Sequence, residues 1–105
     1  LSGTNNPLPV ESEESNVPTQ FSLYQNYPNP FNPSTNIKFD IPEASFVNVS
    51  VFNILGEKVA ELINEYMNAG SYKVSFGAER LSAGIYLYKI TAGSFNYTRK
   101  MTLVK

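Results

Sequence analysis

The stretch that most restricts the fold of this chain reads Tyr27-Pro28-Asn29-Pro30-Phe31-Asn32-Pro33-Ser34-Thr35. Each proline fixes its own φ, lacks an N–H, and moves the preceding residue into an extended conformation. Such a segment is stiff and extended, yet it cannot be a central strand, because every proline leaves a gap in the ladder. Rings at Tyr27 and Phe31 are costly to leave in water. We therefore expect this segment to lie along the edge or end of a β-fold, where it anchors the chain and protects the edge from pairing.

The composition indicates one all-β domain. Seven Tyr and seven Phe suit the half-buried surfaces of sheets better than those of helices. If roughly 20 residues at the front form a tail, about 85 remain, which is enough for one hydrophobic core and not for two.

The absence of cysteine and histidine excludes several classes of function. Disulfides, Ser-His-Asp or Cys-His catalysis, and the usual zinc sites cannot be built. Glu57, Glu61, Glu65 and Asp40 match the spacing of no calcium loop. We therefore predict that the chain is not an enzyme and holds no metal or cofactor.

Charge and hydropathy narrow the partners further. The net charge of −1 argues against nucleic acid, because phosphate binding needs clustered cations. No apolar run is long enough for a transmembrane segment. The chain begins Leu-Ser-Gly, without Met or an apolar signal, and is expected to be a piece cut from a longer precursor.

The first 20 residues differ in character from the rest. They contain Pro7, Pro9 and Pro18 with three Glu and no Lys or Arg, so they carry a charge of −3 and leave about +2 for the remainder. Residues 1–20 are predicted to be a flexible acidic interdomain linker, and residues 21–105 the folded domain.

From Phe21 onward, strand signals recur every dozen residues or so. Alternation puts one set of apolar side chains on one face of each predicted strand: Ile37, Phe39 and Ile41; Val47, Val49 and Val51; Tyr72, Val74 and Phe76; and Phe95, Tyr97, Met101 and Leu103. The stretch 84–91 is apolar on both faces, as in a central strand. Two turns follow from local chemistry: Asn53 to Gly56 predicts a bulged hairpin closed by a left-handed glycine, and Gly93-Ser94 a tight connection.

One segment gives conflicting signals. Between Glu57 and Met67 the apolar residues have helical spacing, which alone indicates a short helix. The hairpin turn before it requires a strand on its far side, and we therefore favour a strand and keep a helix as the alternative. With that strand the chain has about seven short antiparallel strands, which is typical of a two-sheet sandwich.

Four stretches, in this order, are similar to a known family: Tyr27-Pro28-Asn29-Pro30-Phe31-Asn32-Pro33, Asn53-Ile54-Leu55-Gly56-Glu57-Lys58-Val59, Leu81-Ser82-Ala83-Gly84-Ile85-Tyr86, and Arg99-Lys100-Met101-Thr102-Leu103-Val104-Lys105. Together they resemble the C-terminal sorting domain (type A) of the type IX secretion system, over about Phe21 to Lys105. The resemblance implies an immunoglobulin-like β-sandwich in an exported protein of the Bacteroidetes or related phyla.

The resemblance also implies a function and partners. The domain would direct an upstream cargo domain of the same precursor across the outer membrane, through the periplasm to the cell surface or the medium. Its partners would be the type IX machinery and an outer-membrane sortase, which usually cuts the domain off and joins the cargo to a surface lipopolysaccharide. A monomer is expected. Carried over by position, the sorting-motif residues are Pro28, Asn29, Pro30, Gly84, Tyr86, Lys100 and Lys105.

Each of these residues also has a purely structural interpretation. The proline segment could act only as an edge cap, Gly84 as a turn glycine with positive φ, and Tyr86 as a core aromatic. Lys100 and Lys105 could be ordinary edge charges. Equally, they could flank a strand, Met101 to Val104, whose exposed edge docks on another protein by strand addition.

Two other functions stay open. A carbohydrate-binding or adhesive module of a secreted hydrolase would use exposed aromatics as a platform, with Tyr66, Tyr88 and Tyr97 as candidates and no Trp to help. A structural spacer would persist in the mature protein.

Overall fold

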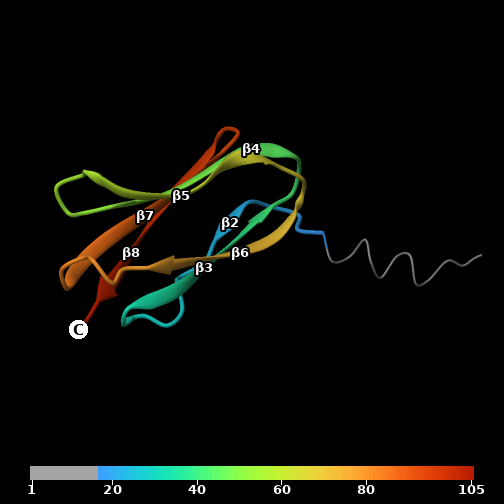
Figure 1. Ribbon diagram of the computed structural model, residues 1–105. Coiled ribbons are helices and arrows are strands. Elements are labelled where there is room, and N and C mark those ends of the chain that lie inside the picture. Colours follow the sequence, from blue (N-terminus) through green and yellow to red (C-terminus); the bar gives the residue numbers. More distant parts are fainter. Residues whose placement is uncertain (1–16) are drawn as a thin grey trace, which may run out of the picture.

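The computed structural model of this chain describes residues 17–105, which form two antiparallel sheets packed face to face (Figure 1). One sheet has the order β2-β3-β6 and contains Ser22–Leu23, Ser34–Ile41 and Gly70–Gly77. The other has the order β5-β4-β7-β8 and contains Lys58–Met67, Ser45–Phe52, Gly84–Ala92 and Phe95–Leu103. The predicted all-β sandwich is confirmed. Of the expected linker, only residues 17–20 are described.

The strand order is that of an immunoglobulin-like sandwich. The first, second and fifth strands in sequence form one sheet, and the other four form the second, so consecutive strands cross between the layers. The chain leaves β3 at Pro42, which has no N–H to donate to a neighbouring strand, and then enters β4 in the other sheet. Among the described residues there is no helix long and apolar enough to span a membrane.

The core lies between the sheets and is built from the alternating positions that the sequence predicts. Its fully buried members include Ile37, Phe39 and Ile41 of β3, Val47, Val49 and Val51 of β4, Tyr88 and Ile90 of β7, and Met101 and Leu103 of β8. Strand β7 lies between β4 and β8, but only the face with Tyr86, Tyr88, Ile90 and Ala92 is buried, and Ile85 on the outer face is 44% exposed.

Strand β5 settles the conflict over residues 57–67 in favour of a strand. Its pairing with β4 skips Val59 and Leu62, so two register shifts place an extra residue in β5 opposite a single step of β4. Each bulge shifts the side-chain alternation by one position. Two such shifts turn a period of two into apolar doublets such as Leu62-Ile63, which mimic helical spacing.

The two predicted turns are also present. Gly56 closes the β4–β5 turn with φ of +87°, a left-handed conformation that costs glycine little. Gly93, with φ of +60°, forms with Ser94 the two-residue connection between β7 and β8.

Candidate functional site

The stretches that resemble sorting motifs meet at one end of the sandwich. We call this the motif end and define it as residues 27–33, 53–57, 78–84 and 100–105. In Figure 1 the β4–β5 hairpin, the loop before β7 and Lys105 lie at one end, and residues 17–20 enter at the other. Two hydrogen bonds join three of these parts: the Ala78 N–H donates to the Pro33 carbonyl at 2.8 Å, and the Lys105 Nζ donates to the Glu79 carbonyl at 3.2 Å.

The proline segment crosses from the edge of the small sheet to β8 of the large one. Tyr27 pairs with Asn36 on the β3 side, and Phe31 pairs in parallel with Leu103 on the β8 side. The Phe31 N–H donates to the Thr102 carbonyl at 2.9 Å, and the Val104 N–H donates to the Phe31 carbonyl at 3.0 Å. The segment therefore closes one open side of the sandwich.

Side chains complete the cover over the β8 edge. The Asn29 Oδ1 accepts the Thr102 N–H at 3.0 Å, and the Gln25 Nε2 donates to the Lys100 carbonyl at 2.8 Å. Four backbone groups between Lys100 and Val104 thus bind residues 25–31. The expectation of an exposed edge at residues 101–104 is wrong, because the proline segment already occupies that edge. Strand addition there would require the segment to leave.

The two rings of the segment have opposite environments. Phe31 is only 1% exposed and meets Phe76 in an edge arrangement with 6.1 Å between ring centroids. Tyr27 is 78% exposed, so the expectation that both rings would be buried is wrong for Tyr27. The two rings differ because they meet different sheets: Tyr27 pairs with Asn36 at the edge of the small sheet, whereas Phe31 pairs with Leu103 of the large sheet and packs in the core.

A buried polar network fixes the start of the segment. Asn26 and Thr35 are each 2% exposed, and the Asn26 Nδ2 donates to the Thr35 Oγ1 at 3.0 Å and to the Pro28 carbonyl at 3.1 Å. The Thr35 hydroxyl donates to the same carbonyl at 2.8 Å. The Asn26 N–H donates to the Tyr88 hydroxyl, which in turn donates to the Tyr24 carbonyl. Burial raises the pKa of Tyr88, the backbone hydrogen bond from Asn26 opposes this, and the phenol stays neutral at physiological pH.

The stretch from Leu81 to Tyr86 shapes the loop before β7. Gly84 has φ of +150°, a conformation that side chains disfavour, although no atom would lie within 4 Å of a Cβ added there. Tyr86 is buried, and its hydroxyl donates to the Ser82 carbonyl at 2.7 Å. Both residues therefore have structural roles, Gly84 as the turn into β7 and Tyr86 as a core ring that ties down the loop.

The two lysines of the last stretch, Lys100 and Lys105, lie on the surface. Lys100 is exposed on the outer face of the large sheet, where it faces Leu87 of β7. Lys105 is exposed beyond the end of β8. Among the seven predicted motif residues, these two and the exposed Pro28, Asn29 and Pro30 are accessible to a partner, whereas Tyr86 is not.

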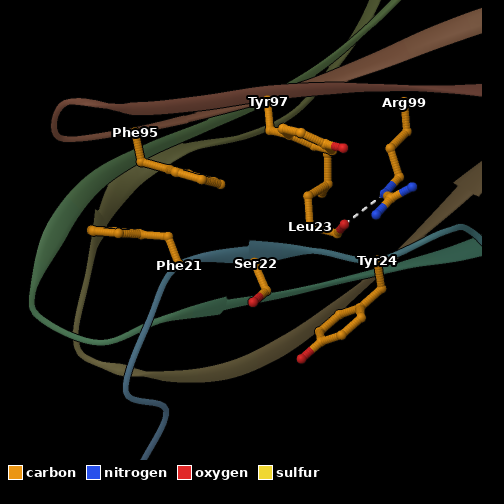
Figure 2. Close-up of a pocket in the computed structure, with 7 residues that line it drawn as sticks. All are labelled: Phe21, Ser22, Leu23, Tyr24, Phe95, Tyr97 and Arg99. Carbon is orange, nitrogen blue, oxygen red and sulfur yellow. Dashed lines mark hydrogen bonds between the residues drawn. The ribbon is translucent and has the colours of Figure 1, made fainter.

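The strands β2 of the small sheet and β8 of the large sheet lie next to each other, and we call the line where they meet the seam. Aromatic side chains close this seam at the end opposite the proline segment. Figure 2 shows Phe21 lying against Phe95, with ring centroids 5.0 Å apart, and Tyr97 next to it. Arg99 lies 5.2 Å from the Tyr97 ring centre, and its Nε donates to the Leu23 carbonyl at 2.6 Å. These groups line a shallow pocket of about 250 Å³ that is open to solvent. The seam is therefore sealed by rings at this end and by the proline segment at the other.

Sequence reasoning missed the residues that hold the segment, namely Gln25, Asn26, Thr35 and Tyr88. An Asn followed by a proline turn is a local signal for a side-chain cap on the turn. Nothing local connects Asn26 with Tyr88, which lies 62 residues away.

The positions of the tyrosines do not favour the carbohydrate-binding alternative. Tyr88 is fully buried, so the expectation that it belongs to an exposed platform is wrong. Tyr66 and Tyr97 are exposed but lie on β5 and β8, the two opposite edges of a four-stranded sheet. Within residues 17–105, no cluster of three or more His, Cys, Asp or Glu side chains could hold a metal ion.

Comparison with known proteins agrees with this architecture. Residues 25–104 match the family model described as "Secretion system C-terminal sorting domain". Comparison with curated proteins gave no significant match. Among solved structures, CopC from Methylosinus trichosporium OB3b is similar with a TM-score of 0.53 and 15% identity, over 80% of this chain and 93% of that chain. At that identity the likeness concerns the fold alone. The family match begins at Gln25 and ends at Val104, so it covers every strand from β3 to β8 and all of the motif end except Lys105, and the chain belongs to the family of type IX secretion system C-terminal sorting domains.

Proposed function

We propose that this domain directs an upstream cargo domain through the type IX secretion system, across the periplasm and the outer membrane, and that a sortase then removes it and attaches the cargo to the cell surface. The family match over residues 25–104 carries this proposal. The chemistry assigned to the domain is recognition and not catalysis.

The gathering of the motif residues at one end supports recognition of the folded domain. Pro28 and Asn29 lie in a segment that is bonded to β8, and Lys105 lies next to the loop before β7. A partner that contacts this end would touch residues from distant parts of the sequence at once. Unfolding would separate them.

The opposite end suits attachment and cleavage. Residues 17–20 enter the domain at the end away from the motif residues (Figure 1). A peptidase could therefore take in the acidic stretch before Phe21 while the motif end is held by the machinery. The composition of residues 1–20, which favours an unfolded chain, agrees with this division of roles.

The test is export of a reporter protein fused upstream of residues 1–105 in a bacterium with a type IX system. Removing residues 103–105 would also remove Leu103, which is buried, and would confuse recognition with folding. Charge reversal is cleaner. We expect the Lys100→Glu and Lys105→Glu double variant to leave the reporter in the periplasm, because it reverses two exposed cations of the motif end without touching the core.

The matched control is the Lys38→Glu and Lys73→Glu double variant. These lysines are exposed and face each other across β3 and β6, in the other sheet. The control changes the net charge equally and should be exported normally. Equal export of both variants would refute the role of Lys100 and Lys105, and a wild-type fusion that stays in the periplasm would refute the function itself.

Cleavage needs a separate measurement. Mass spectrometry of the surface-attached reporter should find no peptide beyond residue 20 if a sortase removes the domain. Peptides from β3 or β7 in the mature product would instead indicate a structural spacer.

A further inference from the structure

The β4–β5 hairpin ends in a turn that exposes two large aliphatic side chains. Ile54 is 72% exposed and Leu55 is 79% exposed, and with Tyr27 at 78% they are the three most exposed large hydrophobic residues among residues 17–105. Turns usually carry Gly, Pro, Asn, Asp or Ser at such positions. The turn therefore presents apolar surface that its own geometry does not require.

Other residues hold the shape of this turn. The Asn53 Oδ1 accepts the N–H groups of Leu55 and Glu57, both at 2.9 Å, and the Asn53 Nδ2 donates to the Glu57 Oε1 at 2.7 Å. The backbone adds Asn53 N–H to the Glu57 carbonyl at 2.9 Å and Gly56 N–H to the Asn53 carbonyl at 3.0 Å. Asn53 and Gly56 thus stabilise the turn, and the side chains of Ile54 and Leu55 do not contribute to it.

A turn fixed in this way loses little conformational entropy when a partner binds it. On the neighbouring strand, Ile85 is also exposed and lies two residues before Leu87, which pairs with Phe52 at the base of the turn. The apolar tip also belongs to the motif end, where the other accessible motif residues lie. A protein of the secretion machinery that contacts the motif end could therefore contact this tip as well.

We propose that Ile54 and Leu55 form a preformed apolar tip that inserts into an apolar pocket of a protein of the secretion machinery. This inference rests on the proposed function and adds a contact to it. The charges around the tip favour a protein over a lipid surface. Glu57 and Lys58 flank the turn, and Lys58 is paired with Glu61 at 3.3 Å, whereas interfacial anchors carry clustered Lys and Arg around their apolar residues.

The test uses the same reporter fusion with the Ile54→Ser and Leu55→Ser double variant. Neither side chain packs in the core, so the thermal midpoint of the chain should stay unchanged. Export should fall by about tenfold or more, because two aliphatic side chains would no longer be buried in the partner. The Ile54→Leu and Leu55→Ile double variant keeps the apolar character and should be exported normally.

The matched control is the Phe46→Ser and Tyr66→Ser double variant. These residues face each other across β4 and β5 at the other end of the same hairpin and are 53% and 67% exposed. Removing this exposed hydrophobic pair should not reduce export. If both serine variants were exported like the wild type, the tip contact would be refuted while the sorting function would stand. If the wild-type fusion were not exported, both would fall.

Two further outcomes would assign the tip to another partner and overturn the proposal. One is flotation of the chain with phosphatidylglycerol or phosphatidylcholine vesicles that is lost in the Ile54→Ser and Leu55→Ser variant. The other is a dimer in sedimentation velocity that is lost in the same variant. We expect neither.

Discussion

Phe31 and Leu103 lie side by side in an isolated parallel bridge, so a residue of the first motif is hydrogen-bonded into the strand that carries the last. Both side chains are buried, at 1% exposure each. The proline segment and the end of β8 therefore form one structural unit, and a substitution in one should change the stability of the other.

The burial of Phe31 predicts a large loss of stability on truncation. Phe31→Ala should lower the free energy of unfolding by about 3–5 kcal/mol, because a buried ring leaves a cavity that the stiff segment cannot fill. Urea denaturation followed by circular dichroism measures this. Tyr27→Ala, at an exposed ring four residues earlier, should change stability by less than about 0.5 kcal/mol. Similar losses for the two variants would contradict the different roles assigned to these rings.

The hydrogen bond from the Thr102 N–H to the Asn29 side chain predicts a local effect. Asn29→Ala should cost about 0.5–1.5 kcal/mol and should speed hydrogen exchange at the Thr102 amide more than at amides of β4. Asn32→Ala, an exposed Asn in the same segment, serves as the control. Unchanged exchange at Thr102 would show that water replaces the Asn29 cap without cost.

The Tyr88 hydroxyl connects the core to the proline segment. Tyr88→Phe should destabilise the domain by about 1–3 kcal/mol, because the Asn26 N–H and the Tyr24 carbonyl lose their partner in a buried site. Tyr66→Phe, on an exposed ring, should have little effect. Equal stability of Tyr88→Phe and the wild type would mean that the two backbone groups find water.

The raised pKa of Tyr88 predicts loss of stability in alkaline solution. The unfolded state releases the phenolic proton first, near its ordinary value of about 10, while the folded state still holds it. Between the two pKa values the folded state binds more protons, so stability is fully present below about pH 10 and falls as the pH rises further. Urea midpoints between pH 7 and 11 should fall less steeply in Tyr88→Phe than in the wild type. A parallel decline in both would assign the effect to other tyrosines, such as Tyr24, whose pKa is raised by its hydrogen bond with Asp40.

The backbone at Gly84 predicts a cost that does not come from crowding. Gly84→Ala should destabilise by about 1–2 kcal/mol because φ is +150°, although nothing lies within 4 Å of the added Cβ. For a domain of this size that corresponds to a fall of about 4–8 °C in Tm per kcal/mol. Ala83→Ser, at the exposed neighbour, should be neutral. A wild-type Tm for Gly84→Ala would show that the loop relaxes to a conformation open to any residue.

The strands show where local patterns are sufficient. Ile37, Phe39 and Ile41, and likewise Val47, Val49 and Val51, alternate without interruption and are all buried as predicted. In β5 the alternation is broken by bulges at Val59 and Leu62, and the pattern alone was ambiguous. Only the pairing partner β4 makes the bulges visible, because a bulge is defined by two residues facing one.

At the motif end, too, the local sequence predicted some features, and others depend on long-range contacts. The proline segment was correctly predicted to lie at an edge, since missing N–H groups exclude it from a central strand. Which edge it occupies depends on bonds between residues about 70 positions apart, such as Asn29 with Thr102, and no local pattern reports these. The expectation of a free edge at residues 101–104 was wrong for this reason.

The sequence by itself determined the all-β class, the inward faces of the regular strands, both glycine turns and the order of the motifs, because each depends on the conformational preferences of neighbouring residues. Only the tertiary structure decided that the motifs meet at one end, that the segment 25–31 covers the β8 edge, and that Ile54 and Leu55 stay exposed while Tyr88 is buried. These outcomes arise from packing two sheets together, where hydrogen bonds and contacts join residues that the chain keeps far apart.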